Sequence, residues 1–160
     1  MVTSIPSTPR ALDAEQALLG SLIMESSSWE KISDRVSPSD FYDTKNKAIF
    51  TEIFELASNE QVVDLLVLEE ALRSKGKLDS IGGREYLAEL TKIVPTLAHI
   101  TQYADIIREK SILRELITIS NKTITSAVVK PFYATSARLR GRNCFSGLVD
   151  HCIHYIDLCL

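Results

Sequence analysis

The side chains that could bind a metal gather near the C-terminus of the chain. All three cysteines lie between residues 144 and 159, and two of the three histidines, His151 and His154, lie among them. Zinc needs four such ligands converging on one point, usually supplied as two closely spaced pairs. No Cys-x₂-Cys pair occurs, and the neighbours His151 and Cys152 would point in different directions on a helix. The spacing therefore favours reduced thiols, and we predict no metal site.

No residue pattern in the sequence is typical of an active site. Glu69 and Glu70 are adjacent, so on a helix they diverge by about 100° and cannot act as a general acid and base pair. His99 has no partner at a spacing that would form a catalytic triad or a ligand set. The phosphate-binding pattern G-x-x-x-x-G-K-[ST] does not occur, and ATP-driven motors need the backbone cradle that it forms. We therefore predict a non-catalytic chain with no cofactor of its own.

Three arginines alternate along the C-terminal segment and could contact phosphate groups: Arg138, Arg140 and Arg142. Nucleic-acid binding usually draws on a broader basic face than this one, so a solvated segment is the favoured interpretation. A regulatory or DNA-binding module that uses this basic tail is the alternative function. A salt-dependent shift of labelled single-stranded DNA that disappears when residues 128–160 are deleted would support that alternative.

The composition is that of an ordinary globular protein. Hydrophobic residues make up 45% and charged residues 24% of the 160 residues, and the formal net charge is −3. The sequence contains no run of 18 apolar residues, and its N-terminus lacks the basic-then-apolar pattern of a secretion signal. These features argue against membrane-spanning and secreted classes and predict a cytoplasmic protein.

The character of the sequence changes near residue 127. Residues 1–127 carry 14 basic and 19 acidic side chains and no cysteine, whereas residues 128–160 carry four basic and two acidic side chains and all the cysteines. A change this abrupt indicates two segments of different origin. We therefore predict a folded domain over residues 1–127 and a divergent tail over residues 128–160 that is foreign to the domain or disordered.

Before residue 127 the sequence predicts helices and no strands. Apolar residues recur with helical periodicity over four main stretches, 12–25, 44–58, 65–75 and 97–127, with shorter helical segments between them. Asp13 and Asp64 are the expected N-caps of the first and third stretches, and Gly76 is the expected end of the third. The predicted fold class is therefore all-α.

Six aromatic residues have spacings that could line a ligand pocket, but such residues on amphipathic helices usually form the core. We predict this for Trp29, Phe41, Tyr42, Phe50, Phe54 and Tyr86. The last predicted helix is different, because its apolar residues cover more than one face, as in the pairs Ile112 and Leu113, and Leu116 and Ile117. A helix that projects from a small head cannot bury two faces internally. We therefore expect one face to bind a partner.

Seven short motifs follow one another in order along the chain. They are AEQALLG at 14–20, DFY at 40–42, IFTE at 49–52, VDL at 63–65, LDSIGG at 78–83, YLAEL at 86–90 and YADIIRE at 103–109. In this order and at these spacings they resemble the N-terminal domain of the bacterial replicative DNA helicase, the DnaB family. The resemblance covers about residues 5–127.

The resemblance implies a compact multi-helix head followed by a long C-terminal helix that pairs with a second helix as a hairpin. In that family the hairpins form dimers, and three dimers make a collar on the hexameric ring. The collar receives the C-terminal domain of primase, and helicase loaders or initiator proteins contact the domain in some systems. DNA contact is expected to be weak or indirect. ATP and Mg would bind the family's separate motor domain, from which no catalytic residue is carried over here.

The sequence departs from the family after Ala127, where the second hairpin helix should follow. The predicted function is a non-catalytic interaction domain that mediates self-association and primase or loader binding during DNA replication. The predicted partner-binding residues all lie on the long helix: Tyr103, Ile107, Arg108, Arg114, Leu116, Ile117 and Ser120. Aspartate at both Leu116 and Ile117 is expected to weaken self-association and to leave the helix content largely intact.

Overall fold

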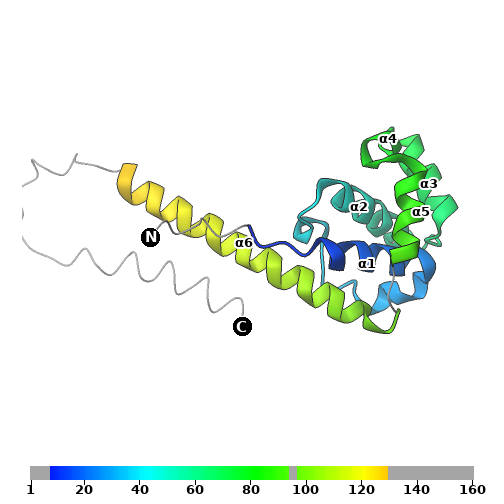
Figure 1. Cartoon of the computed structure of the whole chain (residues 1–160), viewed down its shortest axis with the longest axis horizontal. Coiled ribbons are helices and arrows are strands. Elements are labelled where there is room, and N and C mark those ends of the chain that lie inside the picture. The colour runs from blue at the N-terminus through cyan, green and yellow to red at the C-terminus, as the bar shows by residue number, and fades with distance from the viewer. Residues whose placement is uncertain (1–7, 94–96, 130–160) are drawn as a thin grey trace, which may run out of the picture. The chain divides into compact units, whose positions relative to one another are not determined.

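The computed structural model describes residues 8–93 and 97–129, and every regular element within these two ranges is a helix. The predicted all-α fold is thereby confirmed, and Figure 1 shows the long final helix α6. The α-helices are α1 (Leu12–Met24), α2 (Thr44–Ser58), α3 (Leu65–Ser74), α4 (Leu78–Ile81), α5 (Gly83–Ile93) and α6 (Ile100–Val129). Three short 3₁₀ helices connect some of them: η1 (Ser26–Lys31), η2 (Pro38–Asp40) and η3 (Leu97–His99).

Carboxylate caps define the starts of two of these helices. The Asp43 side chain accepts hydrogen bonds from the first backbone N–H groups of α2, and Asp64 accepts one from the Val67 N–H at 2.8 Å. Asp64 is thus the predicted cap of α3, and Gly76 follows that helix with a φ of 65°. The prediction for Asp13 was wrong. The N-cap of α1 is Ala11, two residues earlier, so Asp13 lies in the first turn of the helix, where its negative charge interacts favourably with the helix dipole.

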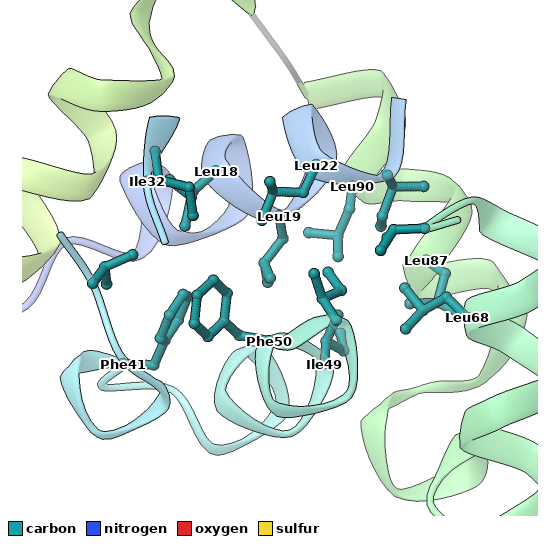
Figure 2. Packing of buried hydrophobic residues seen from close by; sticks show 14 of the residues in the cluster. Leu18, Leu19, Leu22, Ile32, Phe41, Ile49, Phe50, Leu68, Leu87 and Leu90 are labelled. Atoms are coloured by element: carbon teal, nitrogen blue, oxygen red, sulfur yellow. The ribbon is translucent and has the colours of Figure 1, made fainter. Parts of the chain in front are cut away.

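The hydrophobic core lies where α1, α2 and α5 meet, with α3 packed beside them. Figure 2 shows its centre, where leucines of α1 and α5 face isoleucine and phenylalanine side chains of α2. The rings of Phe41 and Phe50 pack with centroids 4.5 Å apart. The fully buried members include Leu18, Leu19, Leu22, Ile49, Phe50, Leu68, Leu87 and Leu90. Burying each such side chain stabilises the fold by about 1.5–3 kcal/mol.

The aromatic residues divide between core and surface. Phe41 and Phe50 are buried, as predicted, and Trp29 and Tyr86 are partly buried against the core. The prediction was wrong for Tyr42 and Phe54, which are 40% and 37% exposed. Tyr42 lies outside the core because its neighbour Phe41 takes the inward position after η2. Phe54 lies at the edge of α2, where its ring packs edge-on against Trp29 with centroids 5.5 Å apart.

A buried polar network joins α1, α2 and α5. The Glu15 side chain is 1% exposed and accepts hydrogen bonds from the Tyr42 N–H at 2.7 Å and the Asn46 Nδ2 at 3.0 Å. The Asn46 Oδ1 in turn accepts one from the Tyr86 hydroxyl at 2.7 Å. A buried carboxylate is stable only when donors surround it in this way. The network therefore fixes the approach of the segment before α2 to helix α1.

The chain divides into two units after Lys122, and the surfaces described below belong to the first unit. The domain boundary predicted at residue 127 stays a prediction. Within the two described ranges, no helix combines the length and the apolar character that a membrane crossing requires.

Candidate protein-interaction surface

Helix α6 is held on the head by one buried face. Ile100, Ala104 and Ile107 are at most 1% exposed, and Ser111 is 3% exposed. These positions follow the helical spacing of an amphipathic stripe. The first three turns of α6 therefore complete the core, and they determine how the later turns of the first unit are presented.

Asp40, the last residue of η2, anchors this part of α6 to the head. Its side chain is 1% exposed, and its Oδ1 lies 2.7 Å from Nη1 of Arg108 on α6. Its Oδ2 accepts hydrogen bonds from the Ser37 N–H at 2.7 Å and the Ser37 hydroxyl at 2.9 Å. Burial raises the pKa of Asp40, but the hydrogen bonds from Ser37, Ser111 and Arg108 outweigh it and hold the pKa below its ordinary value. The carboxylate is therefore charged and bridges two elements.

Arg114 makes a second connection between α6 and this part of the head. Its guanidinium donates to the backbone carbonyls of Asp40 and, at 3.0 Å, of Pro9. It also lies 5.7 Å from the centroid of the Tyr42 ring, within the range of a cation–π contact. Arg108 and Arg114 thus bind the head of their own chain, and their contacts orient α6.

The side of α6 opposite to the buried face is also apolar. Residues nine positions apart on an α-helix differ by about 180° in direction. Each position of the buried face therefore has a counterpart on the far side. The counterparts of Ala104 and Ile107 are leucines and that of Ser111 is a serine, whereas the counterpart of Ile100 is the charged Glu109. The pairs are Ala104 and Leu113, Ile107 and Leu116, and Ser111 and Ser120.

The second face is exposed in the described part of the chain. Leu116 is 54%, Ile119 51% and Ile117 45% exposed, and Ile112 and Leu113 are 43% and 38% exposed. We call these five residues and Ser120 the outer face of α6. Several large apolar side chains exposed together on one side of a helix indicate a protein interaction site. The outer face is therefore the candidate functional site.

The predicted partner-binding residues fall into two groups. Leu116, Ile117 and Ser120 lie on the outer face and are exposed. Ile107 is buried in the core, and Tyr103 packs partly buried against it. The two predicted arginines contact Asp40 at the end of η2, as described above. The first group can touch a partner directly, whereas the second group acts within the head.

Some residues of the site were not in the prediction. Ile112, Leu113 and Ile119 belong to the outer face, and their helical spacing relative to Leu116 would have identified them. Asp40 was missed as the anchor of α6. The Ser37-x-x-Asp40 spacing of a capping box was the available signal, and the structure shows that box.

The residues of the tail considered as metal ligands or phosphate contacts fall in a part of the chain that the structure does not describe. The three cysteines, His151, His154 and the three arginines of the tail lie outside the described residues. Within the described ranges, no group of three or more histidine, cysteine, aspartate or glutamate side chains could hold a metal ion.

Comparisons with known proteins agree on one family. Residues 7–109 match the family model of the DnaB-like helicase N-terminal domain. The chain is 46% identical over 119 residues to the replicative DNA helicase DnaB of Haemophilus influenzae, a match that covers 74% of this chain and 25% of that protein. The chain thus spans about a quarter of the length of the curated relatives it matches.

Solved structures show the same likeness. The crystal structure of the N-terminal domain of DnaB helicase from Mycobacterium tuberculosis superposes with a TM-score of 0.74 at 30% identity, over 76% of this chain and 88% of that one. A DnaB-like replicative helicase, described together with its interactions with primase, matches with a TM-score of 0.65 at 27% identity, over 91% of this chain and 35% of that one. The seven ordered motifs, the helical head and these matches together show that the chain belongs to the family of DnaB-like helicase N-terminal domains.

Proposed function

We propose that this domain is a non-catalytic interaction module of DNA replication in the cytoplasm, which self-associates and binds primase or a helicase loader through the outer face of α6. The observation that carries the proposal is the exposed apolar face opposite the buried face of the same helix. Burying the exposed part of each of its leucine and isoleucine side chains would contribute about 1 kcal/mol to association.

The similar helicase described with its interactions with primase supports the choice of partner. The two chains share the fold, so a surface for primase on this head is the natural expectation. The match of residues 7–109 to an N-terminal domain, with no active-site pattern in the sequence, supports a binding role and not catalysis. Within this proposal the outer face touches the partner, while Tyr103, Ile107, Arg108 and Arg114 hold the helix that presents it.

Light scattering on a sizing column tests self-association. The chain has a mass of 17.9 kDa, and we expect the wild-type protein to elute as a dimer. The double variant Leu116→Asp with Ile117→Asp places two carboxylates in the apolar contact, so we expect at least about 30-fold weaker association. Mixing each protein with the C-terminal domain of primase from the same source tests the second contact, as a joint peak that the variant loses.

Circular dichroism and a matched variant complete the test. Leu66→Asp with Val67→Asp adds the same charge at apolar residues of α3 that are 66% and 37% exposed and lie outside α6. This control should associate like the wild type. A loss of helix content in the α6 variant would show that Leu116 and Ile117 are core residues, and a wild-type monomer that ignores primase would refute the proposal.

A further inference from the structure

A groove of about 470 Å³ lies on the head between η1 and the segment that joins α2 to α3. Its floor includes the half-buried Trp29, and Val62 on its wall is 65% exposed. Phe54 packs edge-on against the Trp29 ring and is itself 37% exposed. The groove therefore offers an aromatic and aliphatic surface that no element in the described part of the chain covers.

The charged side chains that line this groove are all negative. Glu30 and Glu60 belong to its lining, and the lining contains no lysine or arginine. Among the described residues, neither carboxylate has a salt-bridge partner. The lysines and arginines with assigned partners pair elsewhere, as Lys75 does with Glu52 and Glu55. Lys31 follows Glu30 in η1 but lies outside the lining, so the charge within the groove itself is negative.

Two helix ends add to this negative potential. Ser26 and Ser27 follow the C-terminus of α1, and Ala57 lies in the last turn of α2, and all three line the groove. The C-terminus of a helix carries about half a negative charge. Basic residues usually compensate it in the last turn, but neither α1 nor α2 has one there. The potential would repel phosphate groups, which excludes nucleic acid and an anionic lipid surface as occupants.

We propose that this groove docks a basic peptide segment of a protein partner, with an arginine or lysine over the Trp29 ring and against the carboxylates of Glu30 and Glu60. A cation over a tryptophan face, with carboxylates beside it, is a favourable site for guanidinium groups. An apolar residue next to the cation contacts Val62. The groove lies on elements other than α6, so this partner contact is separate from the outer face.

The single tryptophan of the chain makes the proposal directly measurable. Because Trp29 is the only tryptophan of the sequence, its fluorescence reports on the groove in the intact chain. The probe is a short synthetic peptide of alternating arginine and leucine, and the control peptide has glutamate in place of arginine. We expect the basic peptide to shift the emission saturably, with an affinity that falls as salt is raised, and the acidic peptide to have no effect.

Charge-neutralising variants test the place of binding. Glu30→Gln with Glu60→Gln should weaken peptide binding about fivefold, the effect of losing two exposed charge contacts. Glu89→Gln with Glu115→Gln changes the net charge equally at exposed residues outside the groove, and it should leave the affinity unchanged. Equal affinities for both double variants, or no emission change up to about 5 mM peptide, would overturn the proposal.

The backbone at Glu60 separates binding from folding. Glu60 follows α2 with a φ of 56°, a left-handed conformation that glycine adopts without strain. Glu60→Gly should therefore raise the melting temperature by about 2–5 °C and still lower the affinity for the basic peptide. A variant that is more stable and binds the peptide as tightly as the wild type would contradict the role of this carboxylate.

Discussion

The ion pair between Arg108 and Asp40 determines how firmly α6 is held on the head, and a double-mutant cycle measures its strength. Arg108→Met keeps most of the aliphatic stem and removes the guanidinium. Asp40→Asn keeps the shape of the side chain and removes its charge. The two single variants and the double variant, compared with the wild type, give the coupling energy of the pair.

The geometry sets the size of that coupling. Asp40 is 1% exposed, whereas the Arg108 side chain is 47% exposed. Removing the arginine therefore leaves a buried carboxylate, but Ser37 and Ser111 still donate to it. We expect Arg108→Met to lower the free energy of unfolding by about 1–2 kcal/mol, and Asp40→Asn by about 2–3 kcal/mol. Because solvent screens the exposed partner, the coupling energy should be about 1 kcal/mol.

Urea unfolding followed by circular dichroism gives the four free energies. A matched control is the pair of Arg35 and Asp105, which also joins α6 to the head but is exposed on both sides, 46% and 60%, at 3.1 Å. Arg35→Met and Asp105→Asn should show a coupling below about 0.5 kcal/mol. If the buried pair couples no more strongly than this exposed pair, burial of Asp40 does not strengthen the contact and the reasoning is refuted.

Three further changes have expected outcomes. Glu15→Gln replaces one carboxylate oxygen, which accepts hydrogen bonds from the Asn46 amide and the Asp43 N–H, with an NH₂ group that can only donate. It should therefore lower the free energy of unfolding by about 2–3 kcal/mol in the same urea assay. Asp64→Ala removes the cap of α3 and should lower it by about 1 kcal/mol, with amide exchange faster in the first turn of that helix. The pKa of Asp40 is lowered in the folded state, so its contribution is fully present above the unfolded value near 3.9 and is lost as the pH falls through the folded pKa. The melting temperature of the wild type should therefore fall more steeply below about pH 4 than that of Asp40→Asn; parallel curves would show that Asp40 does not carry this effect.

Much of the fold could be predicted because local signals and packing agree. The apolar periodicity of residues 44–58 matches the bounds of α2, and Asp64 and Gly76 delimit α3 as their types suggest. Two glycines at positive φ mark the change from α4 to α5, since Gly82 caps the end of α4 and Gly83 begins α5. In each case the residue at the helix boundary has a side chain that caps helices or a backbone that readily adopts positive φ. Such preferences act locally and do not depend on tertiary contacts.

The position of single side chains was harder to predict. Tyr42 and Phe54 have the composition of core residues, yet each lies beside a better-placed ring, Phe41 or Trp29. Periodicity assigns a face to a helix, but it does not say which of two adjacent aromatics the core has room for. Arg108 and Arg114 show the same limit, since their partners in the segment from Pro9 to Asp40 are 68 or more positions away in the chain.

The two faces of α6 follow from different constraints. Its buried face ends at Ser111, where the head no longer covers the helix, and Arg114 still donates to the Asp40 carbonyl at the end of η2. Beyond that point every described side chain of the first unit is exposed, and leucine and isoleucine are still frequent. Apolar residues that the head cannot cover are not needed for its stability. Their placement on the side of the helix away from the buried face agrees with the proposed contact with a second protein, and the arginines that orient the helix keep that side directed away from the head.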